Sequence, residues 1–264
     1  MNQFRRTFAA LALCFVACGD DGAHDHSDVN DVTVGQGSSS NTTIIAGGSS
    51  STTIVGGGPL TNEPRSVEPF TSVSISSSIE ATLRVGPQAV TASAEANVLP
   101  HLLTKVEGQT LDISMEPNIA YQNVRPSVGI TIPALDRVEV SNSAKVTGEL
   151  NAAAPTISAS KSSEVDLKVT ATNGVTVDAA TSSTIALSGV ASDLHVTAST
   201  SATFTSTLRP ASATVDASGS SHVEIFASSE VHIKATTSAQ VVVHGNPAIR
   251  DVHTATSGEV SFED

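Results

Sequence analysis

The side chains that could do chemistry are few, and the best group lies near the C-terminal end of the chain. His232, Lys234, Asp251 and His253 offer two imidazoles, an amine and a carboxylate, which are groups that transfer protons or bind polar ligands in proteins. They meet only if the chain returns on itself at a constant interval, because position 232 is as far from 251 as 234 is from 253. The alternative is ordinary variation along an exposed surface. No HExxH, CxxC, GxSxG or glycine-rich phosphate loop accompanies the group, so the sequence indicates no catalytic or metal site and no cofactor.

A constant interval of this kind is present, because one nine-residue segment occurs seven times. The segments begin at Val138, Ile157, Val177, Val196, Val215, Ile233 and Val252, so that each start follows the last by eighteen to twenty positions. Position one is always Val or Ile, and position nine is always Val, Ile or Phe. Position six is always serine: Ser143, Ser162, Ser182, Ser201, Ser220, Ser238 and Ser257. Self-similarity at a fixed short period is typical of a solenoid.

Apolar and polar residues alternate on both sides of each serine, and this pattern predicts two strands per repeat with one buried face each. A strand–helix–strand unit needs ~30 residues or more, so a repeat this short has no room for a helix. Parallel stacking puts like residues ~4.8 Å apart, which explains residue-for-residue repetition better than an antiparallel meander does. We therefore expect an all-β fold, with a right-handed parallel β-helix of about seven 19-residue rungs over residues 136–264. Its length would be roughly 30–35 Å.

The repeated serine has two interpretations. One is a row of hydroxyl groups that binds a ligand. The other is a stacked turn in which each hydroxyl bonds a neighbouring rung or a local backbone group. We favour the second, because position seven is Ser, Ala or Gly and small size is what a tight corner requires.

The residues before the repeats fall into two parts. Residues 18–64 are rich in Ser, Thr and Gly and predict a disordered tether, because such a composition buries little apolar surface. Residues 65–135 predict strands without the repeat period, with a hairpin at 102–115 and one helical turn at 97–103. We expect an N-terminal β subdomain here that caps the first rung. The other end of the coil has no obvious cap beyond Glu263 and Asp264, which leaves open an exposed edge or an oligomer formed through it.

Residues 1–17 predict a signal peptide, with Arg5-Arg6 before a short apolar run. Phe15-Val16-Ala17-Cys18 resembles a bacterial lipobox, which implies cleavage before Cys18, a lipid on its thiol and a membrane-anchored protein. Gly19, where an Asp would hold a lipoprotein at the inner membrane, implies the outer membrane. The alternative is an ordinary cleaved signal peptide. The two cysteines are Cys14, inside this segment, and Cys18, directly after it, so the exported part has a single cysteine and no disulfide framework.

Three features carry a resemblance to the autotransporter-adhesin head GIN domain family over roughly residues 67 to 264. They are the opening Phe70–Ile75, the middle Val128–Val138 and the repeated Ser-x-Ser corners, and a near-terminal Val243–Pro247 accompanies them. The resemblance implies an exported β-helical protein that is often lipid-anchored, with no ligand or active site attached. Family corners are typically Ser-Gly-Ser-Gly, and Ser218–Ser221 comes near that pattern. Elsewhere Asn142, Lys161 or Thr replaces the glycine, and Thr predicts a corner without positive φ.

Two functional classes remain. The first is a non-enzymatic envelope protein that adheres, binds a glycan or another envelope protein, or acts as a spacer. The second is a polysaccharide lyase or hydrolase on the same scaffold, which is an analogy of fold only. Tight turns and 3% aromatic residues favour the first class. The formal charge of −13 argues against nucleic acid as a partner.

Overall fold

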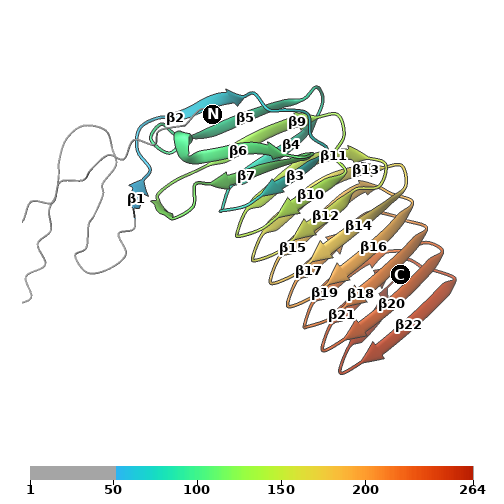
Figure 1. Cartoon of the computed structure of the whole chain (residues 1–264). Helices are drawn as coiled ribbons and strands as arrows, with labels where there is room; N and C mark the ends of the chain where they lie inside the picture. The colour runs from blue at the N-terminus through green and yellow to red at the C-terminus, as the bar shows by residue number, and fades with distance from the viewer. Residues whose placement is uncertain (1–51, 264) are drawn as a thin grey trace, which may run out of the picture.

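A computed structural model of the chain describes residues 52–263. The predicted signal peptide, Cys18 and the tether up to residue 51 lie outside the described residues. Figure 1 shows a rod of stacked strands in which β22 marks the C-terminal end. The predicted parallel β-helix is confirmed.

Two long sheets form the rod, and each contains nine parallel strands. The first sheet has the order β22 (Ile249–Ala255), β20 (Glu230–Thr236), β18 (Ser212–Ala217), β16 (Asp193–Ala198), β14 (Gly174–Ala179), β12 (Thr156–Ala159), β10 (Arg137–Val140), β3 (Ser72–Ile75), β7 (Thr110–Met115) and the antiparallel β6 (Leu102–Glu107). The second has the order β2 (Leu60–Arg65), β5 (Ala89–Glu95), β9 (Ser127–Ile132), β4 (Glu80–Val85), β11 (Lys145–Ala152), β13 (Glu164–Ala171), β15 (Thr184–Val190), β17 (Thr203–Ser206), β19 (His222–Phe226), β21 (Gln240–His244) and β23 (Glu259–Glu263). In this sheet β2 and β5 are the antiparallel strands.

The strands pair so that like repeat positions stack. Val138 pairs with Ile157, Ile157 with Val177, and Val177 with Val196, and the same register continues to Val252. Each rung therefore places position one above position one, as the period predicts. The register also fixes which polar side chains share an outward column.

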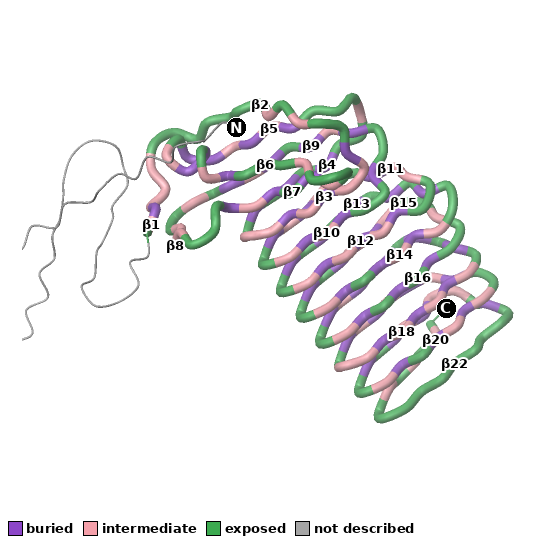
Figure 2. Tube along the Cα trace, in the orientation of Figure 1, coloured by how far each residue is buried: buried purple, intermediate pink, exposed green. Residues whose placement is uncertain are grey.

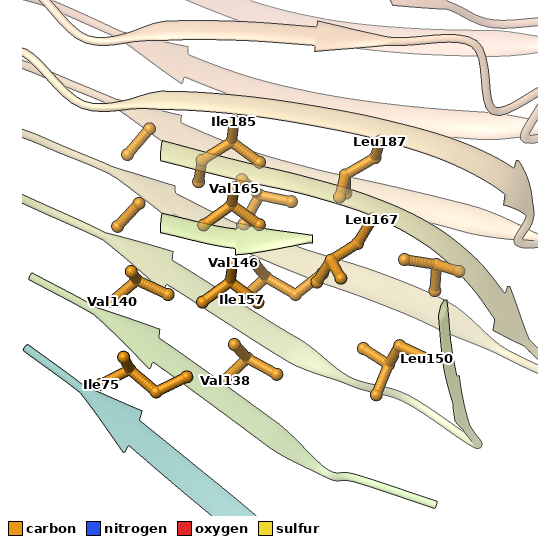
Figure 3. Close-up of a cluster of buried hydrophobic side chains, with 14 of the residues drawn as sticks. Ile75, Val138, Val140, Val146, Leu150, Ile157, Val165, Leu167, Ile185 and Leu187 are labelled. Carbon is orange, nitrogen blue, oxygen red and sulfur yellow. The ribbon is translucent and has the colours of Figure 1, made fainter. Parts of the chain in front are cut away.

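The core is a thin column of aliphatic side chains between the two sheets. Figure 2 shows buried and less buried residues alternating along the strands. Figure 3 shows Val146, Val165 and Ile185 following one another in successive rungs, with Leu167 and Leu187 beside them. All five side chains are at most 2% exposed. Because parallel stacking brings identical positions into contact, one aliphatic residue type suits each column.

The corner after the first strand of each rung is a tight turn with two left-handed residues. At all seven repeats the φ angles of positions five and six lie between 50° and 63°, and the position-seven N–H donates to the position-four carbonyl at 3.0–3.4 Å. Positive φ at both central residues is the property of a type I′ turn. The prediction that Thr would avoid positive φ is wrong: it stands at 50–54° in four corners, as Thr181, Thr200, Thr237 and Thr256.

Bonds between rungs explain why the corner tolerates threonine. The position-six N–H of each corner donates to the position-five carbonyl of the next rung, at 2.7–3.0 Å, from Ser78 through to Ser238. Left-handed conformations in non-glycine residues persist where the surrounding structure over-determines them. Here two backbone hydrogen bonds per corner set the conformation whatever the side chain.

Residues 65–135 differ from the predicted separate subdomain, because two further rungs lie within them. Val73–Ala81 forms an eighth rung of the same kind, with Ile79 and Ala81 departing from positions seven and nine: Val73 pairs with Val138, and Ser77 and Ser78 have φ of 66° and 57°. β7 and β9 form the next rung outward, against β3 and β4. The first and second rungs are thus reversed relative to chain order.

The cap consists of antiparallel strands added to this outermost rung. β6 pairs with β7 as the predicted hairpin, and the 3₁₀ turn Leu99–His101 lies within the predicted helical segment. β5 pairs with β9, and β2 pairs with β5. Thus strands, not loops, close this end of both sheets.

Part of the predicted tether is ordered. β1 (Thr52–Val55) pairs in parallel with β8 (Ile119–Gln122), and β2 belongs to the second sheet. Ile54 explains the order of β1, because it is 4% exposed. The predicted boundary at residue 64 is therefore too late, since strand pairing has already begun at Thr52.

Candidate functional site

The four candidate residues near the C-terminal end lie on two neighbouring strands, as the repeat interval predicts. β20 and β22 pair with His232 opposite Asp251 and Lys234 opposite His253. His232 Nδ1 lies 3.2 Å from Asp251 Oδ2, and its Nε2 lies 2.8 Å from Glu230 Oε1. His253 Nε2 lies 3.3 Å from the other Asp251 oxygen. Lys234 turns the other way, 3.5 Å from Asp216 on the preceding rung.

Two carboxylates hold the His232 ring between them. Hydrogen bonds to Asp251 and to Glu230 raise the pKa of His232, because both favour the imidazolium form. The ring is 42% exposed, and both nitrogens already have partners. In residues 52–263 no group of three or more His, Cys, Asp or Glu side chains is arranged to hold a metal ion. The cluster is best described as a surface ion network that joins the last two rungs.

The seven position-six serines form the expected file along one corner of the rod, and all seven are exposed. The backbone N–H groups of the first six, from Ser143 to Ser238, donate to the next rung. Within the described chain the structure records no hydrogen bond from any of their hydroxyls. The favoured interpretation, that each of these hydroxyls bonds a neighbouring rung or a local backbone group, therefore has no support at position six.

Position seven supplies the hydroxyls that bond between rungs. Ser163, Ser183 and Ser221 are at most 1% exposed, and each donates to a carbonyl of the preceding rung: Val140, Ala159 and Ala198, at 3.0–3.2 Å. In other rungs Ala stands at this position instead of Ser. The sequence therefore indicated position seven by the small size of its residues and not by one constant residue type.

The last rung has a partial cover that the sequence reading missed. Arg250 occupies an inward position on β22, opposite Val231, and its guanidinium carbon lies 4.2 Å from the centre of the Phe262 ring. Its nitrogens donate to the Pro247 carbonyl and the Asn246 side chain. Val252 remains 36% exposed beside it. An inward-pointing charge on an edge strand opposes pairing with another chain.

A hollow lies at the other end of the serine file, where the chain leaves the regular corner. Between β7 and β9 the corner is replaced by the longer segment 116–126, which carries β8. The hollow has a volume of about 430 Å³, and its lining includes Ser77, Ser78, Asn118 and Tyr121. Tyr121 is the single tyrosine of the chain. Its position in a long departure from the repeat was the signal that could have identified it.

None of the helices in the described part of the chain has the length and apolar character needed to cross a membrane. The only helical element there is the three-residue 3₁₀ turn.

Comparison with known proteins agrees with this architecture. The crystal structure of a "putative adhesin" from Bacteroides fragilis has a TM-score of 0.74 at 14% identity, covering 80% of this chain and 100% of that one. One from Parabacteroides distasonis has a TM-score of 0.60 at 18% identity, with the same two coverages. A "putative lipid binding protein" from Parabacteroides distasonis gives 0.50 at 13% identity, again covering 80% and 100%. At these identities the likeness shows the fold alone.

Sequence comparison gives the family. No curated protein sequence matches the chain significantly. The family model described as "Putative auto-transporter adhesin, head GIN domain" matches residues 69–247, which is more than half of the 264 residues. This chain belongs to the auto-transporter adhesin head GIN domain family.

Proposed function

We propose that this chain is an exported protein of the cell envelope, lipid-anchored to the outer membrane through Cys18, that adheres or binds rather than catalyses. The observation that carries the proposal is the family match, since the family and two of the three structural relatives above have the name "putative adhesin". The lipobox-like Phe15–Cys18 supports the anchor, and Gly19 supports the outer membrane. A partner would be a glycan or another envelope protein.

The outer surface of the rod supports a binding role. Its polar columns carry ion pairs between rungs, such as Lys145–Glu164 at 2.7 Å and Lys168–Glu149 at 3.2 Å. These pairs join neighbouring strands. Binding through a long, rigid, repetitive surface is a common use of solenoids.

The anchor is tested by metabolic labelling with radioactive palmitate. We expect label in the wild-type protein and in Cys14→Ala, because Leu13 before Cys14 does not fit the lipobox. Cys18→Ala should carry none. Equal labelling of Cys18→Ala and wild type would refute the anchor.

The binding role is tested with beads coated with residues 52–264. We expect them to adhere to immobilised envelope polysaccharide and to release no reducing ends or unsaturated sugars from it. Uncoated beads are the control. Beads that fail to adhere would refute the polysaccharide partner, and released products would indicate an enzyme.

A further inference from the structure

We propose that the hollow beside Tyr121 binds one ring of a neutral polysaccharide. The proposal rests on the binding role proposed above and names its ligand class. It concerns the hollow lined by Ser77, Ser78, Asn118, Tyr121 and the apolar residues Met115, Pro117, Ile119, Val124 and Pro126, together with Glu116, which we call the Tyr121 groove.

The groove owes its existence to the one corner that departs from the repeat. Every regular corner turns in four residues, whereas segment 116–126 extends away from the stack and carries β8 outward to pair with β1 (Figure 2). The facing wall is the regular corner of the neighbouring rung, Ser77 and Ser78. Loops held by a rigid scaffold are where binding residues gather, and here a regular hydroxyl-bearing corner forms the opposite side.

The lining matches the two surfaces of a sugar ring. Sugar C–H groups form apolar patches that pack on an aromatic face, while hydroxyls need donors and acceptors at fixed places. Tyr121 supplies the aromatic ring, and Pro117 and Ile119 extend the apolar wall. The Ser77 and Ser78 hydroxyls and the Asn118 amide supply polar groups. The volume of about 430 Å³ lies in the range of small-molecule sites.

Tyr121 is held in place before any ligand arrives. Its hydroxyl donates to the Glu116 carbonyl at 3.2 Å, and β8 pairs it with Ile54, which is 4% exposed. Partial burial and the nearby Glu116 raise the pKa of Tyr121, so the phenol stays protonated at neutral pH. A fixed ring loses little side-chain freedom on binding, which favours affinity.

Charge selects a neutral ring over an acidic one. Neither Lys nor Arg is among the residues that line the groove. The one carboxylic acid in the lining, Glu116, is 2.7 Å from His101 Nδ1, so its carboxylate already has a hydrogen-bond partner. Phosphate or a uronic acid would meet a carboxylate and no free cation, and the chain as a whole carries −13. A neutral hexose is not repelled by the Glu116 carboxylate or by the net negative charge of the chain.

The chain offers its own probe for the experiment, because it contains one tyrosine and no tryptophan. Intrinsic fluorescence of the full chain therefore reports on Tyr121 alone. The protein is titrated with maltohexaose, cellohexaose and mannohexaose, and with oligogalacturonate as the acidic comparison. We expect a saturable change in tyrosine emission with at least one neutral probe and none with oligogalacturonate.

Variants locate the site by saturation-transfer NMR with the same probes. Tyr121→Ala should weaken binding at least about tenfold, whereas Tyr121→Phe should keep most of it because the ring remains. If Tyr121→Ala fails to fold, Ser77→Asn replaces it: Asn142 holds the same corner position in the next rung with φ of 53°, and the larger amide would fill the groove. Val190→Ala, at a 59% exposed position on β15, is the control and should bind as wild type.

Several results would overturn the groove proposal. They are unchanged tyrosine emission with every neutral probe, preference for oligogalacturonate, or undiminished binding by both Tyr121→Ala and Ser77→Asn. The bead assay separates this failure from that of the proposed function. Beads that adhere to envelope polysaccharide while the groove variants also adhere leave the binding role intact and place the ligand elsewhere.

Discussion

Removing one buried hydroxyl should cost far more stability than removing its exposed neighbour in the same corner. Ser183 is 1% exposed, donates to the Ala159 carbonyl and accepts from the Ala180 N–H, both at 3.0 Å. Ser182 is exposed, and only its backbone N–H bonds the next rung, to Thr200 at 3.0 Å. Ser183→Ala and Ser182→Ala therefore delete the same atom from two environments.

The expected cost follows from the bonds that survive. After Ser183→Ala, the Ala180 N–H still donates to the Ala159 carbonyl at 2.9 Å, so neither backbone group is left unpaired. The loss is then two net hydrogen bonds, about 1–2 kcal/mol in the free energy of unfolding. Ser182→Ala should stay within about 0.5 kcal/mol of wild type. With an m-value of about 3 kcal/mol/M, the urea midpoints should differ by about 0.5 M.

The assay is urea unfolding followed by both far-UV circular dichroism and tyrosine fluorescence. Coincidence of the two signals is required, because repeat arrays can lose cooperativity, and Tyr121 reports from the N-terminal end. Ser163→Ala and Ser162→Ala repeat the comparison one rung earlier. Equal effects from the two substitutions within a corner, or a larger effect from Ser182→Ala, would refute the assignment of the rung-to-rung hydroxyl to position seven.

Three further predictions test the core, the ion network and the last rung. Phe204→Ala, at the largest fully buried side chain, should lower the free energy of unfolding by about 3–5 kcal/mol, whereas Phe204→Leu should cost much less; urea midpoints would show it, and a small loss for Ala would contradict the packing. The pKa of His232 is raised, so its contribution to stability is complete below pH ~6.5 and is lost as pH rises through the raised value. Amide exchange in β22, corrected for intrinsic rates, should therefore be slower at pH 6 than at pH 9, and His232→Gln should abolish this difference. A difference that persists in His232→Gln would contradict the role of His232. Arg250→Val should increase self-association in sedimentation velocity by uncovering Phe262 on an edge strand, while Arg209→Val, which removes a similar stack on Phe226 at 4.4 Å, should not; identical behaviour of the two would exclude Arg250 as an edge-blocking group.

The repeat sequence predicted the regular part of the rod because stacking carries residue identity from rung to rung. The repeated positions Val138, Ile157 and Val177 predict one buried column of stacked side chains. The same register correctly predicts that His232 lies beside Asp251. The repeat could not predict that Lys234 forms its ion pair with Asp216, because the register fixes the column of a residue and not the rotamer of a flexible side chain.

Where the period is interrupted, the prediction failed for a topological reason. Val73–Ala81 matches the repeat except at positions seven and nine, but the next copy along the chain begins only at Val138, and the cap strands fill the interval. Order in β1 and β2 comes from pairing with β8 and β5, which local composition does not reveal. The left-handed Thr181 likewise follows from bonds between rungs and overrides the local preference of a β-branched residue.

The reversed order of the two outermost rungs constrains how the body can assemble. β7 and β9 are made after β3 and β4, yet they dock on the far side of them, and β10 then returns to the near side. A chain leaving the ribosome or a membrane pore therefore cannot coil progressively from its amino end. Stacking that begins at β3 and β4 has to extend in both directions, and only beyond β10 does each new turn follow the last in chain order, so duplication or loss of a whole repeat unit is easiest there.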